Sequence, residues 1–185
     1  NLWRAAAALW RDAGKFRSDL ASAALLSQVL TEERGRPIPL GDNRVLTYLD
    51  TGEPILVDSR SIDALNYILG WEIESHVMSV FLRTLKFDSV FIAVGANFGL
   101  FTIKAASHLR ARGKIFAFEP NPLTNALLKQ TVLANLIHNE PNVHISDHLV
   151  SHFDGDGTLH FSVSELGGAS VHRTFEGGDS VKVKA

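Results

Sequence analysis

The fold is decided by the stretch Val90-Phe91-Ile92-Ala93-Val94-Gly95-Ala96-Asn97-Phe98-Gly99, an apolar strand that ends in a glycine-bearing turn and opens a helix. Glycine has no Cβ, so Gly95 and Gly99 can adopt positive φ and let a ligand approach the main chain. The N–H groups that begin the next helix attract a carboxylate or a phosphate. The turn is therefore a candidate binding site, although a tight turn without a ligand has the same composition.

Apolar runs and helical patterns alternate from this turn onward. The expected strands are Ser89–Val94, Lys114–Phe118 and Val143–Asp147, and the expected helices between them are Phe98–Arg112 and Pro122–His138. A β-α-β-α-β series of this length predicts an α/β fold with a parallel, Rossmann-like sheet and right-handed crossovers. Ligands of such sheets bind beyond the carboxyl ends of the strands. The expected functional segments are Ala93–Gly99, Glu119–Pro122 and Ser146–His152.

The remaining segments flank this series. Arg44–Leu49 and Pro54–Asp58 surround an Asp-Thr-Gly turn and predict a β-hairpin, and Ser61 is expected to cap a helix that reaches Ile68. A further helix is expected over 72–85. Further strands are expected over Gly157–Val163 and Ser180–Lys184, joined by a polar, glycine-rich connection over Ser164–Asp179.

The N-terminal segment has a different pattern. Large apolar residues recur at helical spacing over Leu2–Leu30, and a break follows with Gly35, Pro37, Pro39 and Gly41. We therefore predict an N-terminal helical extension over residues 1–42 and an α/β domain over residues 43–185.

Composition narrows the class of protein. The 18 Lys and Arg residues nearly balance the 20 Asp and Glu residues, and the net charge of −2 led to the expectation of no nucleic-acid partner. No run of 18 uncharged apolar residues occurs, so no membrane partner is expected. The absence of cysteine excludes disulfides, thiolate metal sites and a cysteine nucleophile. A cytoplasmic location is the default expectation.

An acidic residue ends the second expected strand. Glu119 follows Gly99 by 20 residues, and a carboxylate there can accept two hydrogen bonds from a ribose diol. This would suit both NAD and S-adenosylmethionine. A GxGxxG turn would need glycine at positions 97 and 100, where this chain has Asn97 and Leu100, so NAD is disfavoured. A solvated charge at a strand end is the simpler alternative for Glu119.

Several motifs together resemble the FkbM-type family of methyltransferases. They are Phe91–Gly99, Ala117-Phe118-Glu119-Pro120-Asn121-Pro122, Asn142-Val143 and Asp154-Gly155-Asp156-Gly157, and the similarity covers about Pro54 to Ala185. The resemblance implies a class I methyltransferase fold and S-adenosylmethionine as cofactor. It also implies methyl transfer to an oxygen of a small molecule such as a sugar or a polyketide-type natural product.

The resemblance also implies a set of cofactor-binding residues. Gly95, Ala96, Asn97, Phe98 and Gly99 would hold the methionine end of the cofactor. Glu119, with Pro120 and Asn121 beside it, would hold the ribose, and Asp147, His148 and Leu149 would lie near the adenine.

Two features depart from the family pattern. Ala93 stands where the family has an acidic residue that helps to organise the pocket around the ammonium group of the cofactor. The sequence ends at Ala185, before a further strand of the Lys-Ile-Asp-Val-Glu-Gly type, so we expect a sheet that is incomplete at its C-terminal side. A catalytically degenerate domain used for protein interaction is therefore one alternative, and an NAD-dependent oxidoreductase is a second.

The catalytic base is the least determined part of the site. His148 and His152 follow the third strand and are weak candidates for a base that deprotonates an acceptor hydroxyl. His144, His148 and His152 recur every four residues, but that spacing aligns ligands only on a helix, so no metal is expected. The expected partners are a small-molecule acceptor and, in a homo-oligomer, further copies of the chain.

Overall fold

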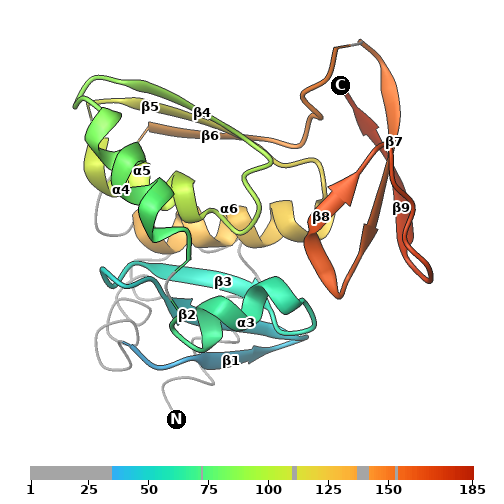
Figure 1. Cartoon of the computed structure of the whole chain (residues 1–185), viewed down its shortest axis with the longest axis horizontal. Coiled ribbons are helices and arrows are strands. Elements are labelled where there is room, and N and C mark those ends of the chain that lie inside the picture. Colours follow the sequence, from blue (N-terminus) through green and yellow to red (C-terminus); the bar gives the residue numbers. More distant parts are fainter. Residues whose placement is uncertain (1–34, 72, 110–111, 137–141, 153) are drawn as a thin grey trace, which may run out of the picture.

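The fold is built from three small sheets and the helices between them. A computed structural model describes residues 35–71, 73–109, 112–136, 142–152 and 154–185. The described residues form three three-stranded sheets and four helices (Figure 1). The helices predicted over Leu2–Leu30 lie outside the described residues.

The central sheet is parallel, as predicted, and has the order β4-β5-β6. Its strands are β4 (Val90–Val94), β5 (Lys114–Phe118) and β6 (Asn142–Ser146). Helix α5 (Leu100–Leu109) connects β4 to β5, and helix α6 (Pro122–Leu136) leads toward β6. The prediction of an α/β chain with a parallel sheet is confirmed.

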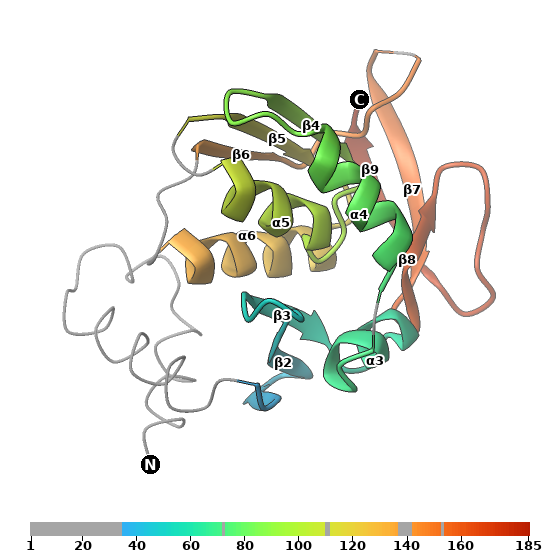
Figure 2. The same cartoon turned by 60° about the vertical axis from the view of Figure 1, so that its left-hand side comes forward.

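The two faces of the parallel sheet differ in their cover. Helices α5 and α6 lie on one face, between this sheet and strands β2 and β3 (Figures 1 and 2), and bury Ile115 and Ala117. On the opposite face, Val90, Ile92 and Val94 of β4 remain 60%, 58% and 62% exposed. Strands of a parallel sheet are normally covered on both faces, so this face is unusual for its class.

The N-terminal sheet contains the predicted hairpin and one unexpected strand. Strands β2 (Arg44–Tyr48) and β3 (Pro54–Asp58) pair antiparallel, as expected. The break predicted before them instead contains strand β1 (Ile38–Gly41), which pairs with β2. Proline is tolerated in β1 because this is an edge strand. The boundary predicted at residues 42 and 43 thus falls in the turn of the β1–β2 hairpin.

A buried lysine of helix α5 joins the helix to the β2–β3 turn. The Lys104 side chain is 5% exposed, and its Nζ lies 2.5 Å from Asp50 Oδ1 and 3.4 Å from Glu53 Oε2. Its hydrogen bond lowers the pKa of Asp50. Burial would raise the pKa of Glu53, but the hydrogen bond from Thr51 and the charge of Lys104 together bring it below its ordinary value.

Two short helices lead from the hairpin to the parallel sheet. Helix α3 (Ile62–Ile68) is capped by Ser61, as predicted, and α4 (Ser75–Thr84) follows. Tyr67 of α3 meets Phe98 edge to face, with ring centroids 5.9 Å apart. None of the described helices is long and apolar enough to cross a lipid bilayer.

The third sheet is antiparallel and has the order β8-β7-β9. Strands β7 (Asp156–Ser162) and β9 (Asp179–Lys184) match the predicted strands. Strand β8 (Glu165–Ser170) lies in the segment that was expected to be a connection. This sheet stands beside the carboxyl ends of the parallel strands (Figure 1), where the sequence placed the functional segments.

Candidate functional site

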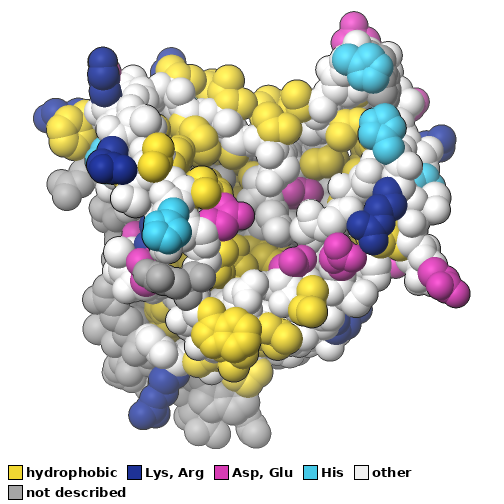
Figure 3. Space-filling model, in the orientation of Figure 1, with side chains coloured by type: hydrophobic (Ala, Val, Ile, Leu, Met, Phe, Trp, Pro, Cys, Tyr) yellow, Lys and Arg dark blue, Asp and Glu magenta, His cyan; other side chains and the backbone are white. Residues whose placement is uncertain are grey.

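A cavity of about 340 Å³ lies at the carboxyl edge of the parallel sheet, in the size range of small-ligand pockets. The surface is hollowed between the parallel sheet and the third sheet (Figure 3). The residues lining the cavity are Val94, Gly95, Asn97, Phe118, Glu119, Pro120, His148, Leu149, Val150, Leu159, Leu166, Gly167, Ala169, Ser170 and Val171. The cavity thus combines apolar walls with a few polar side chains.

The two glycines of the first turn have different tasks. Gly95 has a φ of +69° and lines the cavity, and a Cβ added to it would meet nothing within 4 Å. Gly99 has a φ of +105°, and a Cβ there would lie 2.7 Å from Leu128 Cδ1 of α6. Gly95 therefore leaves room for a ligand, whereas Gly99 permits close packing between the turn and α6.

The backbone N–H groups of this turn are largely engaged within the protein. Gly95 and Ala96 donate to the carbonyl oxygen of Phe118 at 2.9 and 3.0 Å, and Gly99 donates to Ala96 at 3.0 Å. The Asn97 N–H donates to Glu119 Oε2 at 2.8 Å. The N–H groups of Gly95, Ala96 and Asn97 therefore join the turn after β4 to the end of β5.

Glu119 connects two loops at the floor of the cavity. It is 6% exposed, and its carboxylate accepts the N–H groups of Asn97 at 2.8 Å and Asn121 at 2.9 Å. Burial raises the pKa of Glu119 despite the lowering effect of these two hydrogen bonds. Within the described part of the chain, Glu119 forms no ion pair. A carboxylate has about four acceptor positions, so two remain for a ligand.

Three buried polar atoms near Glu119 lack partners among the described residues. They are Asn97 Oδ1, Asn121 Nδ2 and Thr124 Oγ1. Buried polar groups in native proteins are nearly always satisfied by protein, water or ligand. Of the three residues, Asn97 is the one that lines the cavity.

The structure brings together part of the predicted site. Gly95, Asn97, Glu119, Pro120, His148 and Leu149 line the cavity. Phe98 and Asn121 are completely buried, and Asn121 Oδ1 accepts the N–H of Leu123 at the start of α6. Asp147 lines a neighbouring cavity. Phe98, Gly99 and Asn121 therefore support the loops that shape the site.

The three histidines in and after the third strand lie in different surroundings. The exposed His148 lines the cavity, and its Nδ1 lies 3.0 Å from Ser146 Oγ. His144 stacks on Phe116 within the parallel sheet, with centroids 5.1 Å apart, and His152 lies in the exposed loop before β7. Among the described residues, no group of three or more His, Asp or Glu side chains could hold a metal ion.

One wall of the cavity is formed by a strand that the sequence did not predict. Leu166, Gly167, Ala169 and Ser170 of β8 line it, followed by Val171. The sequence Glu-Leu-Gly-Gly-Ala-Ser has no apolar alternation, so the strand gives no periodic signal. Its two adjacent glycines were the available clue, because they permit close approach of another chain segment.

Comparisons with known proteins give a weak match. No family model matches the chain, and no curated protein matches it. The chain is similar to a solved structure described as "The complex structure of aTrm5 and tRNALeu", with 16% identity and a TM-score of 0.39. The match covers 71% of this chain and 42% of that chain, so this chain spans less than half of the length of the one it matches.

This match bears on the predicted partners. The near balance of charge led us to exclude nucleic acid, whereas the matched solved structure is a complex with tRNA. That exclusion is therefore wrong. Net charge averages over a surface, and binding depends on how the charges are distributed.

Proposed function

We propose that the cavity binds S-adenosylmethionine and that the chain carries the cofactor-binding part of a class I, S-adenosylmethionine-dependent methyltransferase. The observation that supports this best is Glu119. This buried carboxylate follows the second parallel strand and lines the cavity. Two of its acceptor positions bind backbone N–H groups. A ribose diol carries the two donors that its remaining positions would accept.

The neighbouring residues fit the other parts of the cofactor. Asn97 Oδ1 is a buried acceptor without a partner among the described residues, and the ammonium group of the cofactor would supply the donor. Asn97 Oδ1 would thus replace the acidic acceptor that the family has at the position of Ala93. Gly95 leaves open space beside the main chain, and Leu149 and Val150 provide apolar surface for the adenine.

Methyl transfer would require the protein to position the acceptor and to accept its proton. S-adenosylmethionine, when bound, supplies an electrophilic methyl group on a sulfonium. The cavity residues would orient the acceptor hydroxyl and exclude water from it. His148 would accept the hydroxyl proton at Nε2, because Nδ1 is within hydrogen-bond distance of Ser146 Oγ.

We propose an oxygen of a small molecule as the acceptor, as the resemblance to the FkbM-type family implies. A domain that has lost catalysis and serves protein interaction is the competing proposal, supported by Ala93 and by the uncovered face of the parallel sheet.

Transfer assays with labelled S-adenosylmethionine would contain separate arms with small-molecule hydroxyls and with tRNA. Label in neither arm, despite cofactor binding, would favour the degenerate domain.

The cofactor is tested by ligand-dependent thermal unfolding. S-adenosylhomocysteine at about 100 times its Kd should stabilise the folded chain by about 2.7 kcal/mol, whereas NAD at the same concentration should leave the midpoint unchanged. Stabilisation by NAD alone would replace the proposal with a nicotinamide-binding protein.

A further inference from the structure

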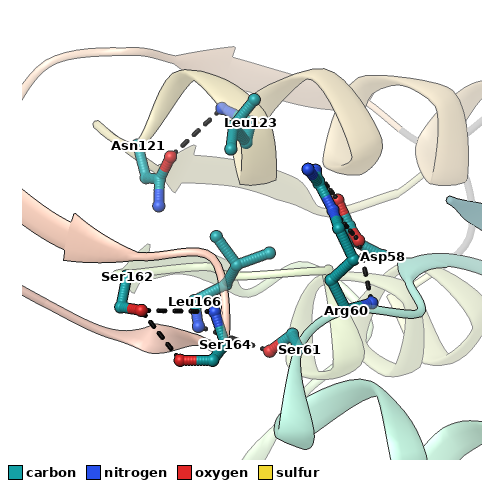
Figure 4. Close-up of polar contacts among 8 residues, drawn as sticks. All are labelled: Asp58, Arg60, Ser61, Asn121, Leu123, Ser162, Ser164 and Leu166. Atoms are coloured by element: carbon teal, nitrogen blue, oxygen red, sulfur yellow. Dashed lines mark hydrogen bonds and ion pairs between the residues drawn. The ribbon is translucent and has the colours of Figure 1, made fainter. Parts of the chain in front are cut away.

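Strand β8 reaches the cavity through contacts with helix α3, which lies about a hundred residues earlier in the chain. Figure 4 shows Ser61 directed toward the loop that begins β8. The Leu166 N–H donates to Ser61 Oγ at 3.3 Å, and the Ile62 N–H donates to the Ser164 carbonyl at 2.9 Å. Ser61 is 1% exposed, so the first of these bonds is shielded from water.

Asp63 forms the next contact along the strand. Its Oδ2 accepts the Gly167 N–H at 2.8 Å and lies 3.2 Å from Ser61 Oγ. Ser61, Asp63 and the first turn of α3 thus hold β8 through backbone bonds on consecutive residues. A carboxylate acceptor makes the bond to Gly167 charge-assisted and stronger than a neutral one.

The same part of β8 faces the glycine-bearing turn. A Cβ added to Gly167 would lie 3.0 Å from Asn97 Nδ2 and 3.0 Å from Asp63 Oδ2. Gly167 is therefore packed between the residue that holds it and a residue that lines the cavity. The other end of α3 contacts this turn as well, because Tyr67 packs against Phe98.

We propose that Asp63 is a positioning residue for the cavity. Its carboxylate holds β8 beside the turn that carries Asn97 and thereby fixes the distance between the two walls that face the ligand. Asp63 is not among the residues that line the cavity, so it acts through Gly167. This inference rests on the proposed function in one respect: the ligand whose binding is measured is S-adenosylhomocysteine.

The test combines ligand binding with a measurement that needs no ligand. In the intact chain, Asp63→Ala should weaken the binding of S-adenosylhomocysteine about fivefold, whereas Asp63→Asn, which keeps an acceptor oxygen, should restore most of the affinity. Asp179→Ala is the control. It removes a carboxylate from β9, at the opposite edge of the same sheet from β8, and should leave the affinity unchanged.

Amide hydrogen exchange of the ligand-free chain separates the two proposals. Asp63→Ala should speed exchange at Gly167 and Leu166 and leave the β4 amides protected. Unchanged exchange at Gly167 would overturn the positioning role, whether or not the ligand binds. Faster exchange in a protein whose wild type does not bind S-adenosylhomocysteine would keep the contact and overturn the proposed cofactor. Equal affinity of Asp63→Ala and wild type would show that β8 does not set the width of the cavity.

Discussion

Two carboxylate sites in this molecule have opposite electrostatic environments. Near the β2–β3 turn, Asp50 and Glu53 surround the ammonium group of Lys104, and both carboxyl pKa values fall. At the carboxyl edge of the parallel sheet, Glu119 has only backbone N–H partners in the described chain, and its pKa rises. The ammonium group of Lys104 thus forms ion pairs with Asp50 and Glu53, whereas Glu119 has no such partner among the described residues.

The difference indicates which group is structural and which is available to a ligand. The ion pairs of Lys104 join the hairpin to α5, and the ammonium group compensates the negative charges of Asp50 and Glu53. Glu119 remains a buried charge without a cation, a costly arrangement for stability alone. A buried acid with a raised pKa that lies in a cavity is a candidate for function, and Glu119 also lines the cavity.

The largest effect on stability should come from the paired group. Lys104→Met would leave Asp50 and Glu53 without their cation and lower the free energy of unfolding by about 2 kcal/mol, a figure reduced by the exposure of Asp50. The affinity for S-adenosylhomocysteine should not change. Denaturant unfolding measures the first quantity, and Lys129→Met on the exposed side of α6 is the control. A loss below about 0.5 kcal/mol, the range of ordinary surface substitutions, would contradict the structural role.

A smaller effect, on binding alone, should come from the unpaired group. Asn97→Gly removes the free Oδ1 acceptor while suiting the φ of 50° at that position, so the affinity for S-adenosylhomocysteine should fall about tenfold with little change in stability. Asn43→Gly makes the same change at a φ of 60° in the β1–β2 turn and should leave binding intact. Equal affinities of both variants, measured by titration, would remove Asn97 from the site.

The pH dependence of binding sharpens the comparison. Ribose hydroxyls would bind the ionised form of Glu119, whose pKa lies above its ordinary value of 4.5. Affinity should therefore fall as the pH is lowered from neutrality, and the fall should begin above the pH range in which an ordinary glutamate is protonated. In Glu119→Gln this pH dependence should vanish. A wild-type affinity that stays constant over this range would argue against a charged acceptor.

The pH dependence of stability should show the paired group. The folded pKa values of Asp50 and Glu53 lie below their ordinary values of 3.8 and 4.5, so their stabilisation is present above those values. It is lost as the pH falls through the lowered folded pKa values. Acid titration of unfolding should show a smaller fall in Lys104→Met than in wild type. The same fall in both proteins would assign the acid sensitivity to other groups.

The sequence predicts best what depends on local pattern. Strands β4, β5 and β6 and the helices between them follow from apolar periodicity, and the Ser61 cap follows from residue type. Glu119 was found by its position at a strand end. These features rest on residues that are close in the sequence.

The missed features depend on long-range contacts. Strand β8 exists because it pairs with β7 and because Ser61 and Asp63 hold Leu166 and Gly167, more than a hundred residues away. The use of the turn N–H groups by Phe118 and Glu119 also requires β4 and β5 to be assembled. Local composition contains no signal for either arrangement.

The central claim is that Glu119 is an acceptor for S-adenosylmethionine, and calorimetric titration of S-adenosylhomocysteine tests it most directly. We predict a Kd near 1 μM for wild type, about −8 kcal/mol. For Glu119→Ala we predict at least a tenfold weaker Kd, in a protein whose circular dichroism remains that of a folded chain. Absence of binding to folded wild type, or equal binding by Glu119→Ala, would contradict the account.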